Sequence, residues 1–372
     1  MRVLITGGGT AGHVNPALAI ADAILKRDKD AVLEYVGTEK GIEGRLVRRR
    51  GMKLHTIEVY GLKRSLSPSN IKVLVKALKA KKRCREIIRE FKPDVVIGTG
   101  GYVCWPLISA ASAMKIPTVL HEANAEPGFA IKTLQKKTDL ILVNFESTKE
   151  KLKRGKNRVL RVGMPVNEEF YRSAEKRPLA KILASEGERE FRILSFGGSL
   201  GARQLNLAVL SLMQEYIKDR PYLKIEHACG ARESEFVMSE VEKRGLSAYP
   251  NITVQEYIYD MPKKMAQADL VICRSGASTL AELAAAGKAS VLIPSPNVTG
   301  DQQRKNAAEL EKRGACAVVD DSTALEDLVK TVKALIEEKD QKRLASMRQE
   351  IKAFAVFDCD DLIYSAICDL LK

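Results

Sequence analysis

The stretch MRVLITGGGTAGHVNPALAIADAI, residues 1–24, decides the fold of this chain. Its apolar run at Val3–Thr6 predicts a buried strand, a glycine-rich turn follows, and the spacing of apolar residues predicts a helix over Ala17–Lys26. The same order of features recurs in FRILSFGGSLGARQLNLAVLSLM at residues 191–213. Because a strand, a tight turn and a helix make one βα unit, the repetition predicts two domains that begin alike.

Other short apolar runs predict the remaining strands of both domains. They are uninterrupted and rich in β-branched residues, as expected for parallel strands covered on both faces. They lie at 32–36, 95–97, 118–120 and 140–143, and then at 224–227, 253–255, 270–273, 290–293 and 317–319. The polar, proline-containing stretch 163–190 separates the two sets. We therefore expect an α/β protein with Rossmann-like domains at 1–163 and 164–355, whose parallel sheets face each other across a cleft.

Composition excludes several classes of protein. With 45% hydrophobic and 29% charged residues, the chain of 372 residues is typical of neither disordered nor membrane-spanning proteins. Its seven cysteines are scattered and form no C-x-x-C pair, which argues against a disulfide framework and against a zinc site. The N-terminus lacks the features of a signal peptide, so we expect a cytosolic protein.

Positive charge is concentrated in one segment. The formal net charge is +14, and Leu62–Lys92 contains eleven basic and two acidic residues. In this segment Ile71, Leu74, Val75 and Leu78 have helical spacing, with Lys72, Lys76 and Lys79 beside them. The pattern favours a helix that docks on an anionic membrane surface, although a helix packed in the core with a solvated basic rim has a similar pattern. A nucleic-acid-binding protein is the non-enzyme alternative; aromatic residues are not interleaved with the charges, so we expect no nucleic-acid partner.

Two glycine-rich turns can bind phosphate, because each offers backbone N–H groups at the start of a helix. In the first turn Gly7, Gly9 and Gly12 fit G-x-G-x-x-G, and Glu34 follows about 20 residues later, so this turn alone leaves a nicotinamide dehydrogenase open. The second turn, 197–202, adds the hydroxyl of Ser199. Two turns in two domains favour two bulky phosphorylated substrates, although glycines also serve simply to permit tight packing of strand and helix.

The second half contains two further helix starts with polar side chains. In CRSGASTLAELAAAG, residues 273–287, Ser275 or Ser278 can cap a helix. Glu282 lies about one turn into that helix, where a carboxylate can bind the two hydroxyls of a ribose. Alternatively, it simply favours the helix dipole or pairs with a neighbouring charge. Gln302 and Gln303 open the next helix and carry amides suited to sugar hydroxyls.

Six motifs together resemble the MurG family of GT-B glycosyltransferases. They are GGGTAGHVNPALAIA, GTGGY (98–102), HEAN (121–124), FGGSLGA, CRSGASTLAE and DQQRKNA, in order, and the resemblance extends from residue 1 to about residue 320. It implies inverting transfer of GlcNAc from UDP-GlcNAc to the C4 hydroxyl of MurNAc in undecaprenyl-diphosphoryl-MurNAc-pentapeptide (lipid I), giving lipid II for peptidoglycan synthesis. It also implies peripheral attachment to the cytoplasmic face of the cell membrane, no metal or other cofactor, and a final helix, 356–372, that returns to the first domain. A related transferase that acts on diacylglycerol is the nearer alternative.

The resemblance also implies roles for individual residues. His13 is the candidate general base, since imidazole titrates near neutral pH, although this histidine can instead simply bond to backbone or substrate. Ser199 would contact the diphosphate, Ile258 the uracil and Glu282 the ribose. The whole implied donor site is Thr10, Ala11, Gly12, Asn124, Ser199, Ile258, Ala277, Ser278, Thr279, Leu280, Ala281, Glu282, Gln302 and Gln303, and the acceptor site is Gly100, Gly101, Tyr102 and His13. The chain departs from the family pattern at Asn167, where an arginine is common, and at Trp105, where a small residue is common.

Overall fold

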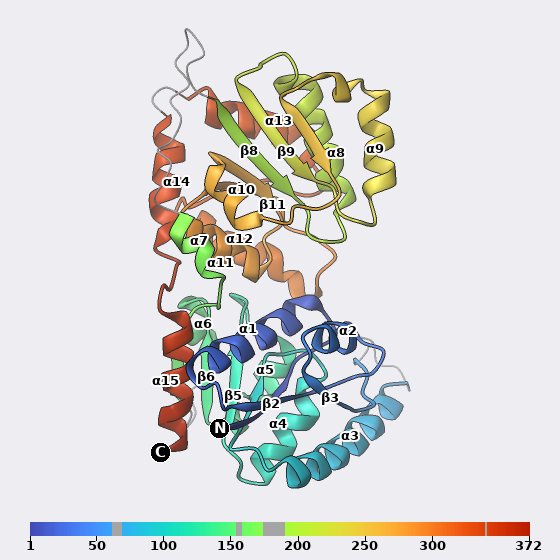
Figure 1. Ribbon diagram of the computed structural model, residues 1–372, viewed down its shortest axis with the longest axis vertical. Helices are drawn as coiled ribbons and strands as arrows, with labels where there is room; N and C mark the ends of the chain where they lie inside the picture. The colour runs from blue at the N-terminus through green and yellow to red at the C-terminus, as the bar shows by residue number, and fades with distance from the viewer. Residues whose placement is uncertain (62–68, 154–157, 174–189, 339–340) are drawn as a thin grey trace. The chain divides into compact units, whose positions relative to one another are not determined.

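The computed structural model describes residues 1–61, 69–153, 158–173, 190–338 and 341–372, with the backbone alone at 69–72, 74 and 173. The chain divides into two compact units, Met1–Pro165 with Asp358–Lys372, and Val166–Phe357. Each unit contains one parallel sheet with helices packed on it (Figure 1). The α/β class and the two Rossmann-like halves predicted from the sequence are confirmed.

The first unit has a seven-stranded sheet in the order β3-β2-β1-β4-β5-β6-β7. Its strands are β1 Arg2–Thr6, β2 Val32–Gly37, β3 Lys53–Thr56, β4 Val95–Gly98, β5 Thr118–Glu122, β6 Leu140–Val143 and β7 Arg158–Arg161. The sequence did not predict β3 and β7. Both are outermost strands that carry exposed basic residues, Lys53 in β3 and Arg158 in β7, so neither forms the continuous apolar run of a central strand.

Helices cover both faces of this sheet. They are α1 Ala11–Arg27, α2 Ile42–Arg49, α3 Ser69–Phe91, α4 Cys104–Ala113, α5 Phe129–Leu134, α6 Ser147–Lys151 and α15 Cys359–Leu371, with a short 3-10 turn η1 at Gln135–Lys137. On one face, α3, α4 and α5 share a core that includes Cys84, Leu107 and Ile131. Helix α15 lies beside α1 (Figure 1), where Arg27 pairs with Asp361 at 2.5 Å.

Helix α1 begins six residues earlier than the sequence predicted, at Ala11 instead of Ala17. The added part of the helix includes Pro16, a residue that removes one helix hydrogen bond. In the structure the ring of Pro16 is buried, and the helix continues through it. The extended backbone of Thr10, with φ −147°, ends the glycine-rich turn, so His13 lies in the first turn of the helix.

The second unit has a six-stranded sheet in the order β10-β9-β8-β11-β12-β13. Its strands are β8 Phe191–Phe196, β9 Leu223–Ala228, β10 Ile252–Gln255, β11 Leu270–Cys273, β12 Ala289–Leu292 and β13 Ala317–Val318. Its helices are α7 Glu168–Ser173, α8 Arg203–Leu212, α9 Ser234–Lys243, α10 Met261–Gln267, α11 Ala277–Ala286, α12 Gln302–Glu311, α13 Ala324–Ile336 and α14 Lys342–Lys352. Shorter turns are η2 Met213–Ile217, which continues α8 as a π-helix, η3 Leu246–Ala248 and η4 Thr299–Asp301. Residues of α8 and α13 share one core with β8 and β9.

Candidate functional site

In both units the polar and glycine-rich motifs follow the carboxyl ends of the parallel strands. In the first unit they follow β1, β4 and β5, and in the second they follow β8, β10, β11 and β12. Parallel α/β sheets bind ligands at this edge, where helix N-termini and loop amides converge. The two edges therefore define one candidate site in each unit.

The turn after β1 is held from two sides by close backbone contacts. The N–H of Gly8 donates to the carbonyl of Gly100 at 3.3 Å. A Cβ on Gly101 would lie 2.0 Å from the carbonyl oxygen of Gly8, so only glycine fits there. On the other side the hydroxyl of Tyr35 donates to the carbonyl of Gly7 at 2.6 Å. These contacts fix the turn as a rigid support for the start of α1.

His13 lies between this turn and the turn after β4. Its Nδ1 is 3.1 Å from Thr10 Oγ1, and its backbone carbonyl accepts a 2.7 Å hydrogen bond from Thr99 Oγ1. The ring fills the space beside Gly100, where a Cβ would approach the ring carbon Cδ2 to 2.7 Å. Burial lowers the pKa of His13, and a hydrogen bond to the backbone of Gly8 opposes this shift. The imidazole is therefore neutral near pH 7, as a general base must be before it accepts a proton.

The other predicted residues of the first unit lie on the same sheet edge. Tyr102 follows β4, is 37% exposed, and packs its ring beside Gly9. Asn124 follows β5, and the buried carboxylate of Glu122 accepts its backbone N–H at 2.9 Å and its side-chain N–H at 3.1 Å. Glu122 also accepts the N–H of Gly128 at 2.7 Å. Its three bonds hold the loop that carries Asn124.

The turn after β8 presents the side chain of Ser199. That residue is exposed, while its carbonyl accepts the N–H of Ala231 at 3.1 Å. The N–H of Gly201 closes the turn onto the carbonyl of Gly198 at 3.0 Å. Helix α8 begins at Arg203, directly after the turn. The positive end of its dipole and the free hydroxyl therefore meet at one place, which suits a phosphate.

Glu282 has the environment of a ligand-binding carboxyl group. It lies in α11, and burial raises its pKa to about 7. Within the described parts of the chain it has neither a hydrogen-bond partner nor an ion-pair partner, so nothing in the structure supports the alternative that it serves as half of an ion pair. A carboxyl group that is desolvated and unpaired is a candidate functional residue.

The serine caps that the sequence predicted for α11 are wrong. The N-cap is Gly276 and no side chain bonds there. The buried hydroxyl of Ser275 instead donates to the carbonyl of Gln303 at 2.8 Å, and Gln303 Oε1 accepts the N–H of Ser295 at 2.8 Å. The first bond joins the start of α11 to the start of α12, and the second joins α12 to the segment after β12. They place Gln302 and Gln303 next to the helix that carries Glu282.

Three further residues from the sequence analysis have local partners. Glu34 is the acidic residue of the dehydrogenase alternative. Its carboxylate is hydrogen-bonded to His55 and to Lys53, so it is not available to bind a ribose. Asn167 Oδ1 accepts the N–H of Glu169 at 3.0 Å and so caps α7. Trp105 is partly buried on the core of the first unit, with the ammonium of Lys81 5.9 Å from its ring centre.

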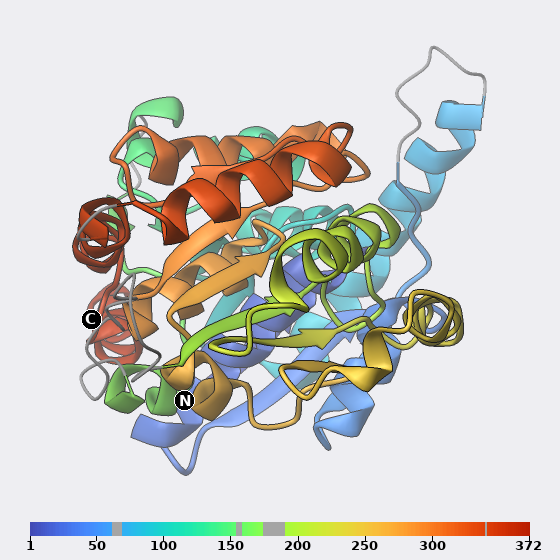
Figure 2. The same cartoon turned by 90° about the horizontal axis from the view of Figure 1, so that it is seen from above.

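The basic helix α3 is only partly committed to the core. Ala80, Cys84, Ile87 and Ile88 face inward, whereas Val75 and Leu78 are 47% and 55% exposed. Lys76 pairs with Glu58 and lies over the ring of Tyr60, and Lys79 is exposed. The side chains of Ile71, Lys72 and Leu74 lie outside the described residues. Figure 2 shows the light-blue amino-terminal end of α3 extending beyond the other helices of the first unit.

Neither a membrane-spanning helix nor a cluster of metal ligands is present among the described residues. No helix in these parts of the chain combines the length and apolar character needed to cross a membrane. Likewise, the described side chains include no group of three His, Cys, Asp or Glu that could hold a metal ion.

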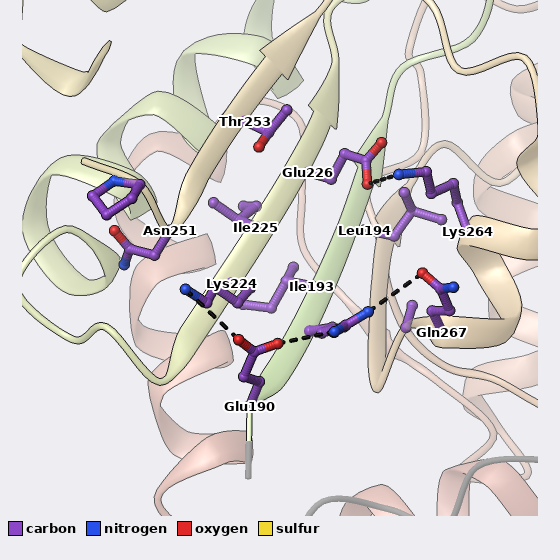
Figure 3. Close-up of a pocket in the computed structure, with 13 residues that line it drawn as sticks. Glu190, Ile193, Leu194, Lys224, Ile225, Glu226, Asn251, Thr253, Lys264 and Gln267 are labelled. Atoms are coloured by element: carbon purple, nitrogen blue, oxygen red, sulfur yellow. Dashed lines mark hydrogen bonds and ion pairs between the residues drawn. The ribbon is translucent and has the colours of Figure 1, made fainter. Parts of the chain in front are cut away.

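A hollow of about 260 Å³ lies elsewhere in the second unit (Figure 3). It is lined by the first residues of β8 and β9, the segment before β10, and α10. Its charges are paired: Glu190 with Arg192 at 2.9 Å and Glu226 with Lys264 at 2.8 Å. Because it lies toward the amino ends of the strands and its charges are matched, it is not the candidate nucleotide site.

Comparisons with known proteins agree with this arrangement. The family model "Glycosyltransferase family 28 N-terminal domain" matches residues 3–143, and "Glycosyltransferase family 28 C-terminal domain" matches residues 192–361. A curated relative from Acetivibrio thermocellus is 39% identical over 100% of this chain and 99% of its own length. Its name is UDP-N-acetylglucosamine–N-acetylmuramyl-(pentapeptide) pyrophosphoryl-undecaprenol N-acetylglucosamine transferase. A relative of the same name from Listeria monocytogenes is 38% identical over 100% of both chains.

Solved structures support the same fold. The crystal structure of MurG from Acinetobacter baumannii has a TM-score of 0.78 and 28% identity, and the match covers 99% of both chains. A UDP-GlcNAc 2-epimerase from Neisseria meningitidis, solved with UDP-GlcNAc, has a TM-score of 0.65 at 16% identity, covering 99% of this chain and 100% of its own; this likeness shows the fold alone. From the two family matches and the full-length relatives, it follows that the chain belongs to the MurG family of GT-B glycosyltransferases.

Proposed function

We propose that the chain transfers N-acetylglucosamine from UDP-N-acetylglucosamine to the C4 hydroxyl of MurNAc in lipid I, with inversion at the anomeric carbon, and so forms lipid II for peptidoglycan synthesis. The observation that carries this proposal is the full-length match to curated transferases of that name. A phosphate-binding turn at the carboxyl edge of each sheet supports it, because donor and acceptor both contain a diphosphate.

The second unit would bind the donor. The amides of the 197–202 turn, the start of α8 and Ser199 suit the diphosphate, and they would also stabilise the charge that develops on UDP as it leaves. Glu282 would accept the ribose hydroxyls, which gives its unpaired carboxyl group a partner. Gln302 and Gln303 would bind the GlcNAc hydroxyls, and Ile258 would contact the uracil through its backbone, since its side chain is buried.

The first unit would bind the acceptor and supply the base. The turn with Gly100, Gly101 and Tyr102 would hold the lipid diphosphate, and Thr10, Ala11, Gly12 and Asn124 would contact the donor sugar. In the chemical step the oxygen of the C4 hydroxyl bonds to the anomeric carbon, and the proton of that hydroxyl passes to His13. The bond between the anomeric carbon and the UDP oxygen breaks, and UDP leaves with its electron pair. A neutral imidazole on a rigid turn suits this role.

The acceptor's undecaprenyl chain requires that the enzyme work at a membrane. The exposed Val75 and Leu78 on α3, with Lys76 and Lys79, would form the surface that docks peripherally on anionic lipid at the cytoplasmic face. Lys76 is engaged by Glu58, so Lys79 is the better placed of the two described lysines to meet a lipid headgroup.

Purified protein assayed for UDP release against a panel of donors and acceptors tests the function. We expect release from UDP-GlcNAc with a lipid I analogue, and much less from UDP-glucose or with diacylglycerol. Turnover with diacylglycerol alone would instead identify the glycolipid transferase. If no UDP is released with either acceptor, the transferase proposal is wrong.

A further inference from the structure

One peptide group joins His13 to a buried carboxylate. The N–H of Gly9 donates to Glu43 Oε2 at 3.3 Å. The neighbouring N–H of Gly8 donates to the carbonyl of Gly100, and a Cβ on Gly100 would lie 2.7 Å from the ring carbon Cδ2 of His13. The backbone of Gly8 also raises the pKa of the imidazole as a hydrogen-bond acceptor. The carbonyl of Gly8 and the N–H of Gly9 belong to the same peptide unit, which is planar and stiff. The direction of one hydrogen bond therefore fixes the direction of the other.

Glu43 is built into its place. It lies in the first turn of α2 and its side chain is fully buried. Besides Gly9, the backbone N–H and the hydroxyl of Thr38 donate to its Oε1 at 3.2 and 2.6 Å. Three donors and the positive end of a helix are the partners that an ionised carboxylate requires when it is removed from water.

Three glycines make room for this carboxylate. A Cβ on Gly8, Gly37 or Gly41 would approach Glu43 side-chain atoms to 2.8, 2.9 and 2.4 Å. The need for glycine at these positions is thus explained by the acid, and not only by tight packing of strand and helix. The turn after β1 and the side chain of Glu43 form one unit.

We propose that Glu43 is a positioning residue for proton transfer, acting on His13 through the Gly8–Gly9 peptide; this rests on the proposed role of His13 as the base. The carboxylate polarises the peptide, and the carbonyl of Gly8 becomes a stronger acceptor for the imidazole N–H. The ring is thereby held in one orientation and one tautomer. Its protonated form is stabilised when it accepts the proton of the C4 hydroxyl. Carboxylates commonly orient catalytic histidines by direct contact, whereas here a peptide group lies between them.

Three other titratable side chains that face the turn are uncharged near pH 7. Tyr35 faces it from β2, Tyr102 from the segment after β4 and Cys104 from α4; burial raises the pKa of all three, and the charge of Glu43 adds to the shift for both tyrosines. Glu122, on β5, is engaged by Asn124 and Gly128. Among the described residues that surround the turn, Glu43 is therefore the charged residue that is hydrogen-bonded to it.

The test compares Glu43→Gln with Glu39→Gln in the full-length chain. Glu39 lies four residues earlier and forms an exposed pair with Arg48, so it controls for loss of a nearby charge. The side-chain amide of glutamine would place N–H donors opposite Gly9 and Thr38, which are themselves donors to Glu43. We expect Glu43→Gln to lower kcat about 10- to 100-fold, the size of effect that a small misplacement produces, and to leave UDP affinity unchanged. Glu39→Gln should leave both unchanged.

Two readouts separate positioning from general damage. In NMR titrations the pKa of His13 should fall in Glu43→Gln, because loss of the negative charge destabilises the imidazolium, and should stay closer to the wild-type value in Glu43→Asp. In a His13→Ala background, Glu43→Gln should cost no further kcat. An unchanged His13 pKa together with multiplicative losses would overturn the inference. Failure of the wild-type protein to transfer GlcNAc would instead count against the proposed function, while the NMR titration would still report on Glu43.

Discussion

Gly201 and Gly230 pack backbone against backbone at the carboxyl edge of the second sheet. A Cβ on Gly230 would lie 2.0 Å from the amide nitrogen of Gly201, and a Cβ on Gly201 would lie 2.1 Å from the carbonyl oxygen of Cys229. The N–H of Gly230 also donates to the carbonyl of Glu256 at 2.9 Å. The loop after β9 therefore fixes the turn to which we assign the UDP diphosphate.

Substitution of Gly230 by alanine should displace that turn and weaken UDP binding. Gly245→Ala is the matched control: both glycines have positive φ, +83° and +64°, so both variants bear the left-handed strain of about 1–2 kcal/mol. Only Gly230 collides with a neighbour, because no atom lies within 4 Å of a Cβ at Gly245. Calorimetric titration should show UDP affinity reduced about tenfold or more in Gly230→Ala alone. Equal affinities in the two variants would show that the contact does not hold the UDP turn.

Replacement of Glu282 by glutamine should weaken UDP-GlcNAc binding and remove its dependence on pH. Ribose hydroxyls donate to the ionised carboxylate, whereas the protonated form predominates below its pKa of about 7. Wild-type affinity should therefore rise between pH 6 and pH 8, and the variant should show a flat profile with about tenfold weaker binding at pH 8. A wild-type profile without slope would contradict ribose binding by this group.

The same carboxyl group should make stability fall as pH rises. Its folded-state pKa of about 7 lies above the ordinary glutamate value of 4.5, so its contribution to stability is fully present below pH 4.5 and is lost as pH rises through about 7. Glu282→Gln removes this dependence. By thermal unfolding, the variant should gain on the order of 1–3 kcal/mol relative to wild type between pH 4.5 and pH 7.5. Parallel unfolding curves for the two proteins would argue that Glu282 is not desolvated.

Replacement of His13 by alanine should abolish turnover without loss of donor affinity. General bases contribute about 10²- to 10⁴-fold, so kcat should fall by that range, while UDP-GlcNAc binding to the second unit persists. Because burial lowers the pKa of His13, the wild-type rate should decline at a more acidic pH than the ordinary pKa of a free imidazole would give. Single-turnover assays across pH measure both effects, and an unaltered kcat in the variant would remove His13 from the chemistry.

The sequence predicted the central strands well, for a physical reason. Strands such as β1 and β11 are buried on both faces and read as plain apolar runs, and glycine at positive φ, as at Gly9, marks a turn. The motifs that follow them were found by family resemblance. Outermost strands such as β3 alternate polar and apolar residues and were missed.

The sequence could not reveal the role of Glu43. An acidic residue in the first turn of a helix is common because it favours the helix dipole, and nothing in GTEKGIEG distinguishes an exposed acid from one buried under a glycine-rich turn. Its significance depends on contacts with Gly9, more than thirty residues away, which only the tertiary structure supplies. The same holds for the bond between Ser275 and Gln303, which replaced the predicted helix cap.

Removal of the exposed apolar side chains on α3 should release the protein from vesicles. Val75 and Leu78 are about half exposed, and each contributes insertion energy only if it enters the lipid. The double change to serine should reduce co-sedimentation with anionic vesicles, as should Lys79→Glu, because each basic residue near such a surface contributes about 1 kcal/mol. Leu25→Ser is the control, since Leu25 is also exposed, at 39%, but lies on α1. Activity on a water-soluble acceptor should be unchanged in all variants. If Leu25→Ser lowers co-sedimentation as much as the α3 changes do, the docking surface lies elsewhere.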